Sequence, residues 1–394
     1  MKDLARQMTQ AIRGRCSDER GVALIVAAGS MIALTSAVAL AVDVGMLTVA
    51  RTQAQTAADG AAMAGAAMLI KSPDNSGLAR VRAIEYAGFN AIQGDGALVQ
   101  DEDVVVDLGA RTVGVQVLRT EERGNPMGTF FARIFGVSSV DITAWAKAKA
   151  SNAGGVNCLL PLAIPDKWSE AGGPGNPPKE FNPELGDVYV PWMDVSTDPP
   201  TYNDDGTATG YSESDIGQEI VLTSNKPGDN YTEEWYYAWR PEGEQGAEDF
   251  EENIQGCVDP SSTYYLGLTV VLSESGNQVG KTRSGFENLI NSDPGATWNE
   301  SMSCVVDSGY ELSDNPAYCR DSSRIRPIPM FDPTDGPDNG AKPFRFSNFS
   351  GVFIDRVEGQ KVIAHWVGYQ GVKPASPEGG TRAGSLLKVV QLIE

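Results

Sequence analysis

An uninterrupted apolar run near the start of the chain is the strongest pattern in the sequence. Residues 21–42 carry no charged side chain, and a helix of 22 residues, at about 1.5 Å per residue, can cross the hydrocarbon core of a bilayer once. The segment before it is basic, with Lys2, Arg6, Arg13, Arg15 and Arg20. Short flanks rich in Lys and Arg remain cytoplasmic. The pattern predicts one transmembrane helix, a cytoplasmic tail over residues 1–20 and an outside location for the rest.

Two other interpretations fit part of this pattern. Ala39-Leu40-Ala41 has the small-x-small form of a signal-peptide cleavage site, but the apolar run exceeds the typical h-region of about 7 to 15 residues. A buried core helix is the second alternative, and a run of this length favours a membrane span over it. We therefore expect an uncleaved anchor.

The helical pattern continues beyond the apolar run. No proline occurs before Pro73, so we predict one helix from Gly21 to Ile70. Spacings of three and four residues place an apolar stripe on its second half, formed by Leu47, Ala50, Ala54, Ala58, Ala61 and Ala64. Such a stripe of small residues predicts close packing against another helix or a sheet.

Small residues also recur inside the apolar run. They form a ladder with a spacing of four, consisting of Gly29, Ala33, Ala37 and Ala41. Membrane helices associate through such small-xxx-small faces, although an Ala-rich helix that faces only lipid has the same composition. Asp43 follows directly, and an ionisable group so near the membrane needs the headgroup region or a partner. We expect it to be either interfacial or in contact with a neighbouring subunit.

Residues 71–150 predict a small α+β platform that packs on the second half of the long helix. After a loop at 73–77, Leu78 begins a predicted helix of about 14 residues. Alternating apolar residues predict strands at 103–108 and 112–118, joined by a turn at 109–111. A short helix over 128–135 and a strand or extended arm over 139–150 complete the layer.

Beyond residue 150 the composition shifts to loops rich in Gly, Pro, Asp and Asn. Strands are predicted at 216–223, 235–239, 264–272, 352–357, 361–367 and 386–393. We therefore expect a mostly β domain with large loops over residues 151–394. The fold class is α+β, with a long N-terminal transmembrane helix, a small platform layer and a mostly β, disulfide-bonded C-terminal domain.

The charge belongs to this last region. The chain has a formal net charge of −21, yet residues 1–150 hold 15 basic and 15 acidic side chains, so the whole surplus lies in 151–394. An acidic chain lacks the positive surface needed to neutralise phosphates, which argues against a nucleic-acid partner.

Cysteine positions agree with the predicted topology. Cys16 lies in the cytoplasmic tail, where thiols stay reduced, whereas four cysteines lie outside, where disulfides persist. Those four allow three connectivities, of which we favour Cys304 with Cys319 and Cys158 with Cys257. Closing the shorter loop would contribute about 3 kcal/mol in the chain-entropy model. A zinc site is the alternative, but there is no CxxC motif or paired His.

Catalytic and ligand-binding motifs are weak. The segment 276–282 (GNQVGKT) has three residues between its glycines where a P-loop has four, so we predict a polar turn without nucleotide. The single histidine, His365, lies in an alternating run that predicts a strand residue, and we expect no enzyme.

Calcium is the one candidate cofactor. Acidic loops could offer oxygen ligands through Asp204, Asp205, Asp332, Asp335 and Asp338, although neither loop has EF-hand spacing and solvated loops have the same composition.

Several short segments of the first 70 residues form a recognisable series: residues 19–23 (ERGVA), 41–45 (AVDVG), 50–51 (AR), 57–59 (AAD) and 61–66 (AAMAGA). Together they resemble the N-terminal region of the TadG-like proteins, which are associated with assembly of Flp (tight-adherence) pili in bacteria. Residues 129–148 (TFFARIFGVSSVDITAWAKA) resemble the region after the anchor, and residues 276–298 and 323–329 resemble segments of the C-terminal regions.

The resemblance implies a single-pass protein of the bacterial inner membrane, with pilin-like design and its bulk periplasmic or extracellular. Its partners would be other pilus-assembly or pilin-like subunits, contacted through the N-terminal helix. Major Flp pilins carry a Glu at the fifth position after a Gly cleavage point, whereas cleavage after Gly21 would place Val26 there. We therefore expect a structural, minor-pilin-like component of pilus assembly with an uncleaved anchor. The alternative is a surface-anchored adhesin, and an envelope hydrolase is a more distant one.

Overall fold

The computed structural model describes residues 19–172, 179–194, 201–203, 206–224, 231–233, 235–240, 247–267, 270–273, 279–309, 319–337, 343–372 and 386–393. The chain divides into two compact units. Unit 1 comprises the described residues up to Ala58 with 87–99 and 116–145, and unit 2 comprises 59–86, 100–115 and the described residues from 146 onward. The domain boundaries suggested by composition, at residues 20, 70 and 150, stay predictions.

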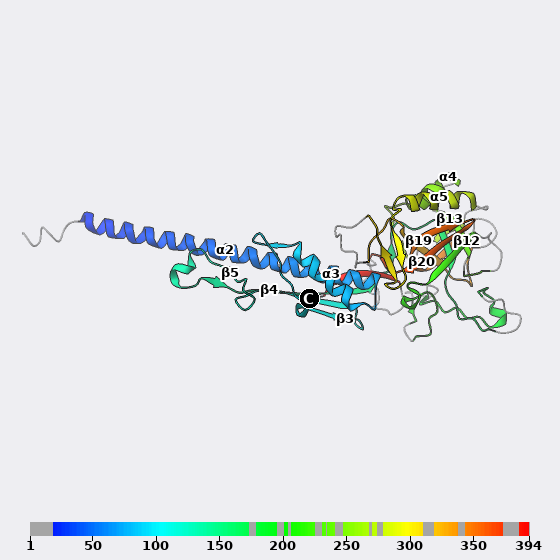
Figure 1. Ribbon diagram of the computed structural model, residues 1–394, viewed down its shortest axis with the longest axis horizontal. Coiled ribbons are helices and arrows are strands. Elements are labelled where there is room, and N and C mark those ends of the chain that lie inside the picture. The colour runs from blue at the N-terminus through cyan, green and yellow to red at the C-terminus, as the bar shows by residue number, and fades with distance from the viewer. Residues whose placement is uncertain are drawn as a thin grey trace, which may run out of the picture. The chain divides into compact units, whose positions relative to one another are not determined.

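Helix α2 extends from Glu19 to Lys71 and contains the whole predicted helix (Figure 1). It is rich in Ala, Leu and Met, which are strong helix formers, and it contains no proline. It ends two residues before Pro73, because the residue that precedes a proline disfavours the helical region. Lys71 in its last turn is a cation at the negative end of the helix dipole. The prediction of a continuous helix over 21–70 is confirmed.

The predicted Ala stripe of α2 is buried. Ala50, Ala54, Ala58 and Ala61 have no exposed surface, whereas Ala64 and Leu47 are half-buried. These small side chains allow other backbone segments to approach the helix closely, so the prediction of a packing face is confirmed.

Gly65 shows how close that approach is in unit 2. A Cβ at this position would lie 2.8 Å from Val113 Cγ1 and 3.2 Å from Ala83 Cβ. Ala83 belongs to helix α3 (Ser76–Gly88), and Val113 belongs to a strand. The AAMAGA segment therefore has its glycine where α2 meets two other elements.

Unit 1 contains two short strand pairs. They are β1 (Ala91–Ile92) with β2 (Asp95–Gly96), and β5 (Met127–Gly128) with β6 (Ser139–Val140). The loop between β5 and β6 contains a single 3₁₀ turn, η2 (Ala132–Phe135). The predicted helix over 128–135 is therefore wrong at its start, because Gly128 pairs with Ser139 in a strand.

A five-stranded sheet has the order β21-β22-β7-β4-β3. Its strands are β21 (Tyr369–Gln370), β22 (Leu387–Leu392), β7 (Ile142–Asn152), β4 (Thr112–Arg119) and β3 (Val104–Asp107). The hairpin β3–β4 follows the 3₁₀ turn η1 (Asp101–Asp103) and pairs Val104 with Val115, as the alternating pattern predicted. The extended arm predicted over 139–150 forms β6 and β7.

The largest sheet of unit 2 closes on itself. Its strands are β12 (Glu219–Ser224), β20 (Lys361–Val367), β19 (Pro343–Glu358), β15 (Val270–Ser273), β13 (Trp235–Arg240), β9 (Leu162–Pro165) and β18 (Ile325–Phe331). Additional pairings join β12 to β13 and β19 to β18, so β12, β20, β19, β18, β9 and β13 form a ring. Closure removes the unpaired edges that an open sheet would present.

The predicted strands at 216–223, 235–239, 352–357, 361–367 and 386–393 correspond to β12, β13, β19, β20 and β22. The single strand predicted over 264–272 is wrong, since the structure has β14 (Tyr264–Tyr265) and β15 with a turn after β14. Gly267 in that turn has a φ of 66°, which interrupts an extended chain.

The other short strands are β8 (Gly155–Val156), β10 (Met193–Asp194), β11 (Thr201–Tyr202), β16 (Thr297–Asn299) and β17 (Cys304–Val306). Two further 3₁₀ turns are η3 (Pro183–Leu185) and η4 (Glu213–Asp215).

Two helices of unit 2 were not predicted. They are α4 (Ala247–Gln255) and α5 (Val279–Asn291), which lie side by side on the ring (Figure 1). The polar turn predicted over 276–282 is wrong from residue 279 onward, because Val279 to Thr282 form the first turn of α5. Phe286 and Leu289 of this helix are buried in the core, so tertiary packing supports a helix whose start looks like a loop.

An aromatic core and two disulfides stabilise unit 2. The Phe346 ring contacts the rings of Trp239 and Phe349 edge to face, with centroid separations of 5.1 and 5.6 Å, an arrangement favoured by their quadrupoles. The disulfides join Cys158 to Cys257 and Cys304 to Cys319, the two pairs that we favoured among the three possible connectivities.

A buried carboxylate lies at the end of β9. Asp166 has no exposed surface, and its oxygens accept hydrogen bonds from Tyr211 N at 3.0 Å and from Tyr189 Oη at 3.2 Å. Burial raises its pKa to about 7, despite these donors. The folded state therefore holds a proton between about pH 4 and pH 7 that the unfolded state has released.

We predict that Asp166 lowers stability as pH rises through this window. Each pH unit within this window corresponds to about 1.4 kcal/mol, so the free energy of unfolding of the full chain in detergent should fall between about pH 4 and pH 7 and level off above it. Asp166→Asn should flatten that fall. Asp259→Asn is the control, because the hydroxyls of Ser261 and Ser262 lower the pKa of this carboxyl, and the fall should persist. Equal slopes in Asp166→Asn and the parent chain would contradict the prediction.

Candidate functional site

The first half of α2 is bare. Residues 21–38 are all exposed, and Ala39 is the first residue that the rest of the chain partly covers. The helix is long and apolar enough to cross a membrane, which is consistent with a single membrane span or a signal sequence. At about 1.5 Å per residue, the bare part is about 27 Å long, close to the thickness of a hydrocarbon core.

The small-residue ladder begins on this bare part and ends just beyond it at Ala41. Gly29, Ala33, Ala37 and Ala41 are all exposed, and no atom of the chain lies within 4 Å of the place where a Cβ of Gly29 would be. The ladder is therefore available to another helix, and its role in helix packing stays a prediction.

Asp43 has an unexpected partner within the same chain. Its side chain is only 3% exposed, and its carboxylate accepts hydrogen bonds from three consecutive backbone amides. The donor–acceptor distances are 2.9 Å to Phe130 N, 3.0 Å to Phe131 N and 2.6 Å to Ala132 N. Both groups belong to unit 1. The two motifs AVDVG and TFFARIFG, which the sequence showed only as separate segments, therefore meet at this carboxylate.

The amides that Asp43 binds are those at the start of η2. A helical turn leaves its first N–H groups without partners, and an acceptor normally comes from the residue just before it. Phe131 occupies that position and its side chain cannot accept, so Asp43 takes over this function from α2. Gly136 ends the turn with a φ of 87°, and its N–H donates back to Arg133 O.

Further internal hydrogen bonds close the loop between β5 and β6. Thr129 donates from Oγ1 to Val137 O at 2.5 Å, and its backbone N–H donates to Ser138 O at 3.1 Å. The Arg133 guanidinium donates to Thr129 O and lies over the Phe130 ring, 5.9 Å from its centroid. The polar groups of the loop are thus satisfied mainly by the loop itself and by Asp43.

The apolar side chains of this loop, in contrast, are exposed. The exposed fractions are 61% for Phe130, 40% for Phe131, 75% for Ile134, 78% for Phe135 and 47% for Val137. Single exposed apolar residues are ordinary, but five within eight residues of one loop form a patch that marks an interaction surface. We call these five residues the apolar loop patch.

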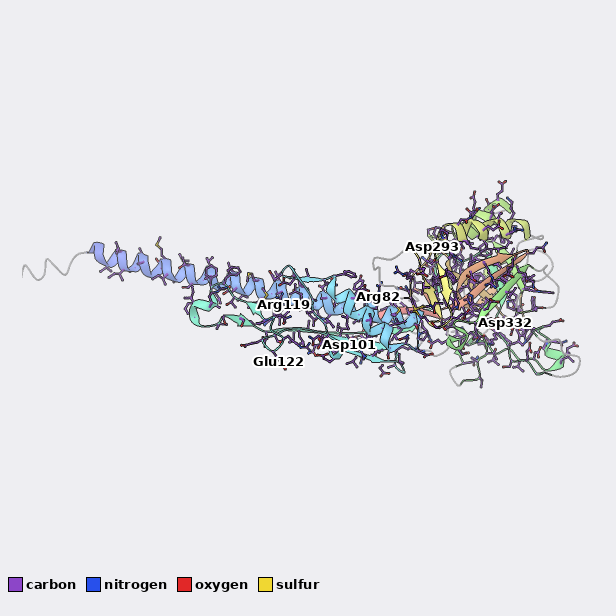
Figure 2. All side chains as sticks on the ribbon, in the orientation of Figure 1. Arg82, Asp101, Arg119, Glu122, Asp293 and Asp332 are labelled. Atoms are coloured by element: carbon purple, nitrogen blue, oxygen red, sulfur yellow. A yellow bond between two sulfur atoms is a disulfide. The ribbon has the colours of Figure 1, made fainter. Side chains whose placement is uncertain are left out.

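Polar contacts hold the remainder of unit 1 together. Arg119 donates to Ile92 O at 2.7 Å and to Asn125 O at 3.2 Å, and so connects the β1–β2 hairpin to the chain after β4 (Figure 2). Gln53 and Gln55 of α2 bind the backbone of Gln93 and Trp145, both at 2.9 Å. These contacts position the outer elements against the helix.

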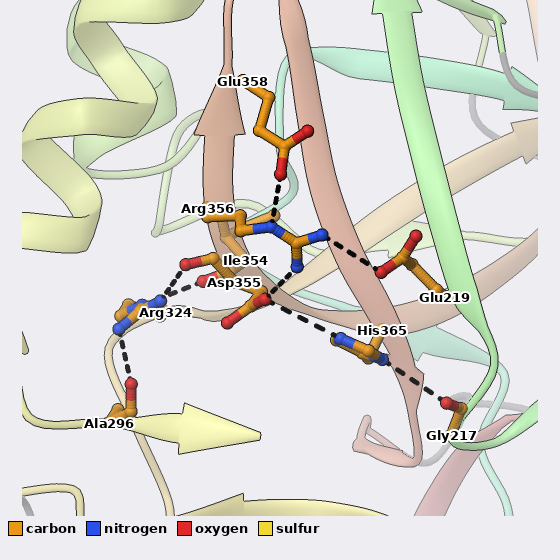
Figure 3. Close-up of polar contacts among 9 residues, drawn as sticks. All are labelled: Gly217, Glu219, Ala296, Arg324, Ile354, Asp355, Arg356, Glu358 and His365. Carbon is orange, nitrogen blue, oxygen red and sulfur yellow. Dashed lines mark hydrogen bonds and ion pairs between the residues drawn. The ribbon is translucent and has the colours of Figure 1, made fainter. Parts of the chain in front are cut away.

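His365 lies in strand β20, as predicted. It is 3% exposed and its ring stacks on Trp298, with centroids 4.6 Å apart. Its Nε2 lies 4.0 Å from Asp355 Oδ2, and its Nδ1 lies 3.4 Å from Gly217 O (Figure 3). Among the described residues, its polar contacts include no Ser, Thr or Cys nucleophile. The arrangement connects strands and does not form a catalytic triad.

Arginines organise the surroundings of Asp355. Arg356 donates to Asp355 at 2.6 Å and to Glu358 at 2.7 Å (Figure 3). Arg324 is buried and donates to the carbonyls of Ile354 and Ala296, while its guanidinium lies 4.7 Å from the centroid of Phe353. These are structural contacts that tie loops to β19.

The calcium prediction gains no support from the described part of the chain. That part contains no group of three or more His, Cys, Asp or Glu side chains that could hold a metal ion. Asp332 (Figure 2) accepts at Oδ1 from the N–H and hydroxyl of Thr334 in a local turn, and Asp335 is exposed. Asp204, Asp205 and Asp338 lie outside the described residues, so calcium binding stays a prediction.

Comparison with protein families identifies the segment that contains the apolar helix. Residues 21–68 match the family model Tad, described as "Putative Flp pilus-assembly TadE/G-like". The match covers the bare half of α2, Asp43 and the whole Ala stripe. The resemblance stated for this segment is therefore confirmed, and the segment is similar to the TadE/G-like pilus-assembly family. Comparisons with curated proteins and with solved structures gave no match.

We predict that Asp43→Ala releases the loop between β5 and β6. Three amides would lose their acceptor, and a hydrogen bond to a charged group contributes about 1.5 to 3 kcal/mol. Amide hydrogen exchange at Phe130, Phe131 and Ala132 in the detergent-solubilised full chain should therefore accelerate at least about tenfold. Asp141→Ala is the matched control, because Asp141 accepts from Glu121 N at 2.8 Å.

In the Asp141→Ala control, hydrogen exchange of the Glu121 amide should accelerate, while the three loop amides should remain protected. Unchanged exchange of those amides in Asp43→Ala would show that Asp43 does not hold the loop.

Proposed function

We propose that the chain is a membrane-anchored structural component of Flp/Tad-type pilus assembly, similar to a minor pilin, that acts through helix packing and protein–protein contact. The observation that carries this proposal is the coincidence of the Tad match at 21–68 with a helix whose first half is bare and whose second half is buried under its own chain. The first half of such a helix can contact lipid and neighbouring helices, while its second half packs against the rest of its own chain.

The ladder supplies the packing surface. Lipid tails are as apolar as Leu, so helices in a membrane associate through close van der Waals contact between small residues and not through hydrophobic exclusion. Gly29, Ala33, Ala37 and Ala41 provide such a face and are uncovered. The partners are pilus-assembly or pilin-like subunits with complementary helices.

Two observations support an orientation with residues 1–20 in the cytoplasm and the remainder outside. The basic flank precedes the span, which follows the positive-inside rule. Both disulfides lie beyond it, and disulfides persist in the oxidising periplasm and not in the cytosol. The proposed location of the chain is therefore the bacterial inner membrane, which its N-terminal helix crosses once.

We predict that Ala33→Leu impairs assembly. A Leu side chain in the ladder would hold a partner helix away, whereas Ala28→Leu adds the same volume on the opposite face of the exposed helix. In cells that lack the native chain, complementation with Ala33→Leu should give pilus numbers at least about tenfold lower than with Ala28→Leu, as for a loss of about 1.4 kcal/mol or more in association. Electron microscopy provides the count.

Equal pilus numbers in both variants, with membrane levels matched by immunoblot, would exclude the ladder as the packing surface. Normal pili in the deletion strain with lost surface attachment would instead support an adhesin.

The proposed topology predicts opposite labelling of two thiols. In intact spheroplasts, a membrane-impermeant maleimide should label Glu122→Cys, an exposed position in unit 1 (Figure 2), and should leave Cys16 unlabelled. Cys16 should react only after permeabilisation. Labelling of Cys16 in intact spheroplasts would reverse the orientation.

A further inference from the structure

The apolar loop patch is separate from the helical ladder and has its own place relative to the span. The patch consists of Phe130, Phe131, Ile134, Phe135 and Val137, and Asp43 holds its loop beside α2 (Figure 1). Asp43 is the first residue after the charge-free run of 21–42. A loop bound to Asp43 therefore lies at the level where the helix leaves the hydrocarbon.

We propose that this loop inserts its apolar side chains into the outer leaflet of the bilayer, as a second membrane contact beside the transmembrane helix. The proposal rests on the proposed function, because it requires that α2 spans the membrane. It assigns the lipid surface, at the boundary between headgroups and acyl chains, as the occupant of the patch.

Depth is the first argument for lipid. The uncovered residues 21–38 extend over about 27 Å of helix, which is a few ångströms less than a hydrocarbon core of about 30 Å. Ala39 and Asp43 are the first positions that the chain covers. The covering loop must therefore begin within the interfacial zone, where exposed Phe and Ile side chains meet acyl chains.

Hydrogen bonding is the second argument. A non-helical loop is tolerated near a membrane core only if its backbone polar groups are satisfied within the protein. Here the amides of Phe130, Phe131 and Ala132 donate to Asp43, and those of Ile134 and Val137 donate to Phe131 O and Ala132 O. A docking loop for a soluble partner has no need of this closure, because water could satisfy the same groups.

Charge is the third argument. Arg133 is the only charged residue between Thr129 and Ser139. Its side chain is exposed, and an Arg stem lies along apolar surface while its guanidinium reaches the interface. The buried carboxylate of Asp43 is shielded by the three amides, so it does not stand unpartnered at the edge of the apolar phase. The loop thus presents its apolar groups to the acyl chains and one cation to the headgroups.

Spin-label accessibility tests the proposal on the full chain. A nitroxide at Ile134→Cys, with Cys16→Ser to remove the other free thiol, would be measured in vesicles of phosphatidylethanolamine and phosphatidylglycerol. We expect it to collide with oxygen, which concentrates in lipid, and to collide at least fivefold less with a polar nickel complex than a label at Leu98→Cys, another highly exposed apolar position of unit 1. A label at Ala33→Cys reports independently on the span.

The outcomes are distinguishable. Polar-reagent access at position 134 equal to that at 98, with position 33 inaccessible to the polar reagent, overturns the loop insertion and leaves the span intact. Low access of both reagents at 134 overturns it in favour of a protein occupant. Polar-reagent access at position 33 overturns both the span and the insertion.

A second measurement is photocrosslinking, which leaves all the native cysteines unchanged. Benzoylphenylalanine at Phe135, which is 78% exposed, should crosslink to lipid after illumination in the same vesicles. Crosslinks to protein alone would overturn the proposal, and a benzoylphenylalanine at Leu98, expected to give no lipid adduct, is the matched control.

Discussion

The hydrogen bonds between the Asp43 carboxylate and the amides of Phe130, Phe131 and Ala132 are the interaction on which the arrangement at the end of the apolar run depends. A lone carboxylate next to such a run is costly, and so are three amides at the start of a turn without acceptors. Each group satisfies the other. Because the loop must lie where Asp43 lies, its apolar side chains have to face outward beside the helix and not toward a core. One interaction thus fixes both the loop and its exposed surface.

The two units gain stability in different ways. Unit 2 has a closed ring of strands, an aromatic core and two disulfides. Unit 1 has short strand pairs and an Ala-lined helix face, which bury little apolar area per residue. Its order therefore relies on directed polar contacts, such as those of Asp43, Arg119 and Gln53. The surfaces open to partners or lipid, the ladder and the apolar loop patch, both belong to this unit.

Much of the fold was predictable where one strong local pattern was enough. The length and composition of the apolar run predicted α2, Ala spacing predicted its buried face, and alternation predicted the β3–β4 hairpin and the strand of His365. Helix α5 was not predictable, because its start is rich in Gly, Lys and Thr and its support comes from Phe286 and Leu289 in the core. The 3₁₀ turn η2 was mistaken for a longer helix, since a pattern of apolar residues does not show that Gly128 pairs in a strand.

The sequence by itself determined the apolar helix, the ladder, the acidic surplus beyond residue 150 and the even set of cysteines, because each depends on side-chain identity and local spacing. Only the tertiary structure decided what Asp43 binds. Phe131 lies 88 residues away along the chain, and the groups that bind Asp43 are backbone amides, which nearly every residue carries. A donor common to the whole backbone leaves no mark in the sequence. The ring in unit 2 is of the same kind, since pairings such as β12 with β20 and β9 with β18 join backbone groups of strands far apart in the chain.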